Sequence, residues 1–203
     1  MRVIGLVYFL LTASALSGQV KPDARAIEWS SGRVLRVSDF KVVKEGHSAP
    51  ESLGGNQAVT RTGFLYTSTQ INSGKEKGRN RIKVQALMYP QHSYIRAGVL
   101  KAAPSAIAYL MNHEQKHFDI SEIYARQAAR FLQTHRFTKN YGPEITNEMK
   151  RLFKEAAAFQ KRYDDETNNG RSRAKQQLWD KYIHEKLKEV SAYSQKDFLL
   201  NVQ

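Results

Sequence analysis

The segment His113–His117, HEQKH, constrains this chain more than any other, because a helix brings its two histidines to one side. Positions four apart on an α-helix differ by only about 40° around the axis, so both imidazoles can bind one metal ion from the same face. Glu114 then lies beside the ion, where it can accept a proton from water whose pKa the ion lowers. The alternative is a solvated helix face with two unrelated histidines, because short motifs also recur by chance.

The surrounding sequence favours the helix and therefore the metal site. Pro104 is suited to a first helical turn, Ser105 carries an N-capping hydroxyl, and apolar residues follow at helical spacing as far as Leu132. Two further helical segments are predicted, one from near Pro143 to the Asn168-Asn169-Gly170 stop and one over 172–190.

Residues 19–103 have a different pattern, with short β-rich stretches separated by Gly, Ser, Pro and Asn. Strands are expected at 26–29, 33–37, 63–67 and 81–89, a loop over 44–58, and a hairpin tip over 74–81. Strands followed by helices predict an α+β fold, with a small N-terminal β-sheet ahead of a helical bundle that carries the HExxH helix. We expect one domain over 19–203, divided at 103–104 into strand-rich and helical parts.

The first 18 residues have the order typical of a signal peptide. A charged start, Met1-Arg2, precedes the apolar run 3–11 and the small-residue stretch 12–18. The alternative is a buried first helix. We expect export to the periplasm or medium, cleavage after about residue 18, and no membrane anchor in the mature chain.

The chain contains no cysteine, so zinc ligands must be His, Asp or Glu, a set that favours a catalytic over a structural site. The formal net charge of +13 would attract polyanions, but lysines and arginines are interspersed with acidic residues over 139–188. This distribution favours a solvated basic surface, and we expect no specific nucleic-acid partner.

A catalytic zinc requires one more protein ligand besides His113 and His117. The metalloprotease class with a third histidine six residues after His117 is excluded, because position 123 is Ile. Asp119 and Glu122 point away from His113 on an unbroken helix, by about 120° and 180°. The ligand is therefore expected from another helix, and the residues alone leave these candidates open: Glu144, Glu148, Glu155, Asp164, Asp165, Glu166, His135 and His184.

Several separated motifs together resemble a known family, the bacterial predicted secreted zinc-dependent proteases, over nearly the whole mature chain. The matching pieces are Ile27-Glu28-Trp29, Arg33-Val34-Leu35, Ser38-Asp39-Phe40, Thr60 to Tyr66, Pro90 with Ser93, Asn112 to Ile120, Glu122, Tyr124-Ala125-Arg126, Tyr163-Asp164, Glu166-Thr167, Gly170, Gln177 and Trp179.

The resemblance implies a Zn²⁺ peptidase acting on a peptide or protein, with His113 and His117 as ligands and Glu114 as catalytic base. It also selects the segment 163–170 for the third ligand, with Asp164 preferred and Glu166 in reserve. The family usually has a histidine just before the closing glycine, where this chain has Asn169. That difference keeps open a catalytically degenerate zinc-binding module, or a basic envelope interaction module.

Four further residues are candidates to support the site or to donate to an oxyanion: Asp119, Glu122, Tyr124 and Tyr163. Asp119 and Glu122 can orient a ligand imidazole, although a simple i,i+4 pair of Glu122 with Arg126 explains the latter equally well. Tyr124 and Tyr163 can supply a hydroxyl, and packing in the core is the alternative for both.

Overall fold

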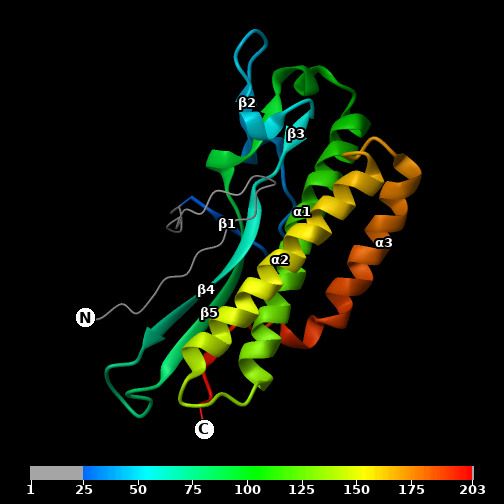
Figure 1. Cartoon of the computed structure of the whole chain (residues 1–203). Helices are drawn as coiled ribbons and strands as arrows, with labels where there is room; N and C mark the ends of the chain where they lie inside the picture. Colours follow the sequence, from blue (N-terminus) through cyan, green and yellow to red (C-terminus); the bar gives the residue numbers. More distant parts are fainter. Residues whose placement is uncertain (1–24, 203) are drawn as a thin grey trace.

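The computed structural model describes residues 25–202, so the predicted signal peptide lies outside the described residues. Strands come first and three helices follow, which confirms the α+β prediction (Figure 1). Within the described residues, no helix has the length and apolar character needed to cross a membrane.

A long antiparallel hairpin of β4 (Thr62–Gln70) and β5 (Asn80–Met88) dominates the larger sheet. The basic stretch predicted as a hairpin tip forms most of its turn. Two short strands, β1 (Ile27–Glu28) and β7 (Asp197–Leu199), pair antiparallel with opposite ends of β5. Chain segments from both ends of the sequence therefore meet on one strand.

The smaller sheet has the order β2–β6–β3. Its central strand β6 (Tyr94–Arg96) runs parallel to β2 (Lys41–Val43) and antiparallel to β3 (Ala58–Val59). β3 is thus an edge strand, and it leads directly into β4.

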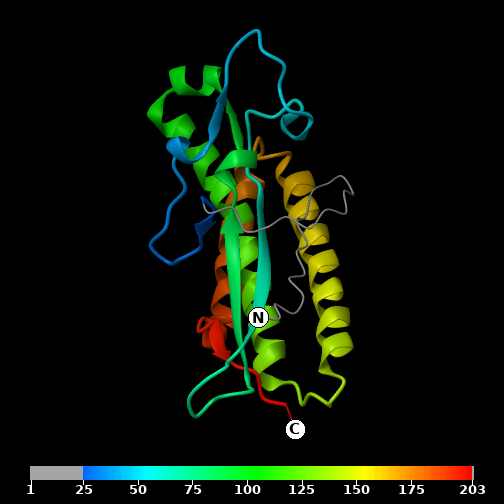
Figure 2. The ribbon, with the colours of Figure 1, turned by 90° about the vertical axis from the view of Figure 1, so that its left-hand side faces the viewer.

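Helix α1 (Pro104–Thr134) is the central element, packed between the β4–β5 hairpin and the helices α2 (Tyr141–Thr167) and α3 (Arg173–Glu189) (Figures 1 and 2). Nine consecutive residues of α1, 118–126, are buried, which requires neighbours on every side of the helix. The main hydrophobic core lies around this stretch, so the HExxH segment is held on a rigid, enclosed helix.

The sequence prediction was wrong about the strand at 33–37, which is irregular chain leading into a 3₁₀ turn at Val37–Asp39. The reason is visible in the hydrogen bonding: the Leu35 amide donates to the Gln115 side chain at 2.8 Å, and not to a neighbouring strand. Strands β2, β3, β6 and β7 were not predicted, and β7 falls in the part expected to be helical. Two- and three-residue strands are too short to show a period, and distant backbone partners define them.

Candidate metal centre

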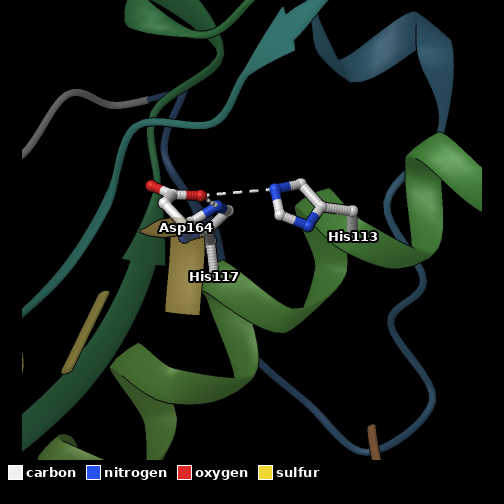
Figure 3. Close-up of side chains that lie close together, drawn as sticks. All are labelled: His113, His117 and Asp164. Atoms are coloured by element: carbon white, nitrogen blue, oxygen red, sulfur yellow. Dashed lines mark ion pairs between the residues drawn. The ribbon is translucent and has the colours of Figure 1, made fainter. Parts of the chain in front are cut away.

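Three side chains from two helices converge on one point. His113 and His117 project from the same face of α1, and Asp164 reaches between them from near the end of α2 (Figure 3). The Asp164 Oδ1 atom lies 3.3 Å from His113 Nε2 and 3.1 Å from His117 Nε2. One ligand atom from each residue lies within 4.8 Å of the other two, so the three form a group able to hold a metal ion.

The two carboxylate–imidazole separations are compatible with a tetrahedral metal ion. Ligand atoms about 2 Å from a tetrahedral ion lie about 3.3 Å apart, which matches the two measured carboxylate–imidazole separations. Two imidazoles and one carboxylate are also a common ligand set for catalytic zinc, and they leave the fourth position open.

Two glutamines fix the orientation of the imidazoles. His113 Nδ1 lies 3.0 Å from Gln176 Oε1, and His117 Nδ1 lies 2.5 Å from Gln160 Oε1. The amide nitrogens donate elsewhere, from Gln160 to the His117 carbonyl and from Gln176 to Asp180, so both amide oxygens face the rings as acceptors. Each Nδ1 must then carry a proton, which leaves each Nε2, beside Asp164, as the atom that can bind a metal ion.

The end of α2 also packs on the His113 ring. Tyr163 stacks on it at a centroid distance of 4.8 Å, and its hydroxyl donates to the His113 carbonyl at 3.2 Å. Gly170 has φ +76°, and a Cβ atom there would lie 2.9 Å from His113 Cγ. Only glycine accommodates both the left-handed backbone and this close approach.

The charges of the site are strongly coupled in the absence of metal. Burial disfavours the His117 imidazolium, but the attraction and hydrogen bond of Asp164 outweigh it, with help from Glu114, and the pKa of His117 is raised to about 9. Burial likewise opposes ionisation of Asp164, yet the two imidazoles hold the pKa of Asp164 well below its usual range. A proton therefore occupies this site when no cation does, and a metal ion must displace it.

Glu114 is only 2% exposed and is held by a partner from the strand side of the molecule. Thr60, between β3 and β4, donates its hydroxyl to Glu114 Oε2 at 2.5 Å. Glu114, both histidines and Asp164 line a cavity of 1090 Å³ between α1, α2 and the β3–β4 segment. A carboxylate on the motif helix and a metal-ligand group thus share one solvent-accessible space.

Comparison with family models finds a match to a bacterial protein family of unknown function, DUF922, over residues 47–171. This is more than half of the chain. The chain belongs to this family. Searches of curated proteins and of solved structures found no match. The DUF922 segment contains β3, the hairpin, α1 and α2, and it therefore includes His113, Glu114, His117 and Asp164.

Asp164 lies in the metal-ligand group, and Glu166, the alternative third ligand, does not. Glu166 turns away from the imidazoles and accepts a hydrogen bond from Trp179 Nε1 at 3.0 Å. Successive residues of a helix point about 100° apart, so two residues along α2 the side chain faces a different neighbour. The other acidic and histidine candidates for the third ligand are not part of the metal-ligand group.

Three of the proposed supporting residues contact groups outside the site. Asp119 accepts hydrogen bonds from Trp29, Gln115 and Lys116, and Glu122 pairs with Arg126 at 2.8 Å and with Lys196. Tyr124 is buried against Phe159, and burial together with nearby Glu155 raises the pKa of its hydroxyl to about 12. None of the three hydrogen bonds to a ligand imidazole in the described structure. Asp119 and Glu122 face other sides of the enclosed helix, and Tyr124 lies about three turns, roughly 16 Å, along α1 from His113.

Tyr163 and Asn169 do lie at the site, in different ways. The Tyr163 hydroxyl is engaged by the His113 carbonyl and Gln176, and its side chain is fully buried, so it supports the ligand and does not face the cavity. Asn169 lines the cavity with a left-handed backbone, φ +51°.

Sequence reasoning missed Gln160, Gln176 and the contact of Thr60 with Glu114. Gln160 precedes Asp164 by four residues, so helical spacing alone places both on one face of α2. Gln176 lies beyond the DUF922 match, and nothing in the local sequence distinguishes it from its neighbour Gln177.

Proposed function

We propose that this chain is a zinc-dependent peptidase that hydrolyses peptide bonds. The observation that supports it best is the convergence of His113, His117 and Asp164 in a cavity that also contains the carboxylate of Glu114. A purely structural site does not need a carboxylate that lines the cavity beside three protein ligands, whereas hydrolysis needs a base there.

The chain's own groups have distinct roles in this proposal. A zinc ion, when bound by the two Nε2 atoms and Asp164, would supply Lewis acidity that polarises a carbonyl and makes water more acidic. Glu114 Oε2 is held by Thr60, so Oε1 remains to take the proton from water and later to deliver it to the leaving amine. Gln160 and Gln176 keep both imidazoles in the tautomer that binds metal.

Edge strand β3 offers a way to align an extended substrate. Arg96 N donates to Gln57 O, which makes residues 57 and 59 the ones that face β6. The backbone N–H and C=O of Ala58 then point away from β6, and Ala58 lines the cavity. The cavity extends along α1 from Ala106 to Ser121, about 22 Å of helix, which is the length of six or seven extended residues.

The test combines metal binding with peptide cleavage by the purified protein. We expect about one zinc per chain, and cleavage of a mixed peptide library that stops when a chelator removes the metal and returns when zinc is added. Glu114→Gln should keep its zinc and lose activity by at least about 100-fold, because this change removes the base and leaves the ligands intact. His113→Ala should lose both zinc binding and peptide cleavage. Equal activity of the Glu114→Gln variant and the wild type would rule out the proposed mechanism.

A second candidate function is a zinc-binding module without activity. The observation that favours it is Asn169, which lines the cavity at the position where the resemblance to the predicted secreted proteases implies a histidine. In that case wild type and Glu114→Gln are equally inactive on every peptide, while both bind zinc. Asn169→His then restores cleavage if the missing imidazole is the only defect.

We also propose export to the periplasm or medium, based on the signal-like sequence of residues 1–18. The mass of the protein recovered from these fractions tests it. A mature N-terminus near residue 19 supports the proposal, and a soluble exported protein that retains Met1 contradicts it.

A further inference from the structure

We propose that Arg171 and Arg173 form a carboxylate-binding end of the metal cleft, so that the substrate carries a negative charge there. This inference rests on the proposed peptidase function and specifies its substrate. Both residues line the same cavity as Glu114 and the three metal-binding side chains. They come from the turn between α2 and α3 and from the first residue of α3.

Both guanidinium groups are held over the cleft. Arg171 reaches across to the loop before β3 and donates from Nη2 to the Gly55 carbonyl at 3.2 Å, which joins the two walls of the cavity. The Arg173 guanidinium lies 4.5 Å from the centroid of the Tyr109 ring, a cation–π contact. Tyr109 precedes His113 by one helical turn, and Gly170 beside Arg171 abuts the His113 ring. The two cations are therefore close to one end of the metal site.

Neither arginine has a carboxylate partner among the described residues, although acidic side chains line the same cavity. Asp164 faces the imidazoles, Glu114 bonds to Thr60, and Asp165 pairs with Lys161 at 2.5 Å. The acids are thus engaged with other groups, and two exposed guanidinium groups remain available at one end.

A guanidinium recognises a carboxylate through two parallel N–H···O bonds, and such charge-assisted bonds are stronger than neutral ones. One helical turn is about 5.4 Å and one extended residue about 3.4 Å, so a bound carboxylate would lie about two residues from the bond to be cleaved. The carboxylate can belong to an Asp or Glu side chain or to the substrate's C-terminus, and the chemistry at the arginines is the same.

The experiment uses four versions of one peptide, with Glu or Gln two residues from the cleaved bond and a free or amidated C-terminus. Their affinities are measured by calorimetry for the zinc-loaded Glu114→Gln protein, which cannot turn the peptides over. We expect the peptide with the recognised carboxylate to bind about tenfold more tightly or better than its neutral counterpart. The pair that differs identifies the source, side chain or C-terminus.

Variants of the full chain locate the effect. Arg171→Gln and Arg173→Gln should each remove most of this preference, whereas Arg173→Lys should keep part of it. Arg136→Gln is the matched control, because it removes one exposed guanidinium that does not line the cavity and should leave the preference unchanged. If an arginine variant does not fold, the Glu114→Gln protein with both arginines intact still tests the inference. Its affinities for the charged and neutral peptides should differ, and added salt should reduce that difference.

The outcomes separate this inference from the proposed function. Cleavage by the active protein without any preference between charged and neutral peptides would overturn the inference and leave the peptidase proposal intact. Carboxylate-dependent binding that is lost in the arginine variants, without cleavage by the active protein, would support the inference and count against the peptidase proposal. The inference would be overturned if Arg136→Gln lost the preference for the charged peptide as fully as the Arg171 and Arg173 variants do. It would also be overturned if the protein bound none of the peptides.

Discussion

Helix α1 and the pair α2–α3 contribute to the metal site in different ways. α1 supplies His113, Glu114 and His117 within five residues, so helical geometry alone places them on one side of the molecule. α2 supplies Asp164 and Gln160, four residues apart on one face, and α3 supplies Gln176. All three meet the motif only through tertiary packing. The chemistry is encoded locally on α1, whereas its orientation depends on the packing of three helices.

This difference implies that α1 by itself makes only half a metal site. Two imidazoles on a helix bind zinc weakly unless a third ligand and fixed ring orientations are added. The Asp164 carboxylate, the two amides and the close approach of Gly170 provide these features from outside the motif.

The largest expected effect comes from removing the ligand that α2 supplies. Asp164→Ala should weaken zinc affinity by more than about 100-fold, since loss of a direct ligand exceeds the 10–100-fold cost of losing an outer partner. Glu166→Ala is the matched control on the same helix and should leave affinity unchanged, because Glu166 bonds to Trp179. Calorimetric titration with zinc measures both. If the two variants bind equally well, Asp164 is not a ligand.

Metal removal should be the next largest effect, because an ion held by His113, His117 and Asp164 would join α1 to α2. Free zinc at about 100 times its dissociation constant adds about 2.7 kcal/mol to the free energy of unfolding. For a chain of this size, that corresponds to a rise in melting temperature of roughly 5–11 °C. Thermal denaturation with zinc and with a chelator tests this, and Asp164→Ala should show little of the rise. If the melting temperature of the wild type is the same with zinc and with a chelator, the result would contradict a metal site between the two helices.

The sequence predicted the long elements and the motif because these have local signatures. The periodicity that leads to Leu132 and the stop at Asn168-Asn169-Gly170 correspond to α1 and to the end of α2. Strands such as β3 and β7 were missed because distant partners define them. Asp164 followed from the family resemblance, since spacing left eight candidates, and Gln176 had no signal because its role depends on how α3 packs against α1.

The two glutamines offer a sharper test of the comparison. Gln176→Leu and Gln160→Leu should each weaken zinc affinity by 10–100-fold, because the ring that loses its acceptor no longer has a fixed tautomer and orientation. The neighbour Gln177 is exposed, so Gln177→Leu is a control of identical chemistry and should have no effect. In the cobalt-substituted protein, the visible spectrum should change in the first two variants only. Unchanged affinity and spectrum in Gln176→Leu would show that α3 does not position His113.

The smallest effect isolates the packing of the α2–α3 turn on His113. Gly170→Ala introduces two penalties, a left-handed backbone at φ +76° and a Cβ atom 2.9 Å from His113 Cγ. Gly74 has the same φ of +76° in the β4–β5 turn, with nothing within 4 Å of an added Cβ, so Gly74→Ala measures the backbone penalty alone, about 1 kcal/mol.

We expect Gly170→Ala to destabilise the protein more than Gly74→Ala in urea unfolding. Its zinc affinity should also fall several-fold, while that of Gly74→Ala should stay unchanged. If both variants lose the same stability and neither loses zinc affinity, the turn yields without moving the imidazole, and the contact at Gly170 has no part in orienting the ligand.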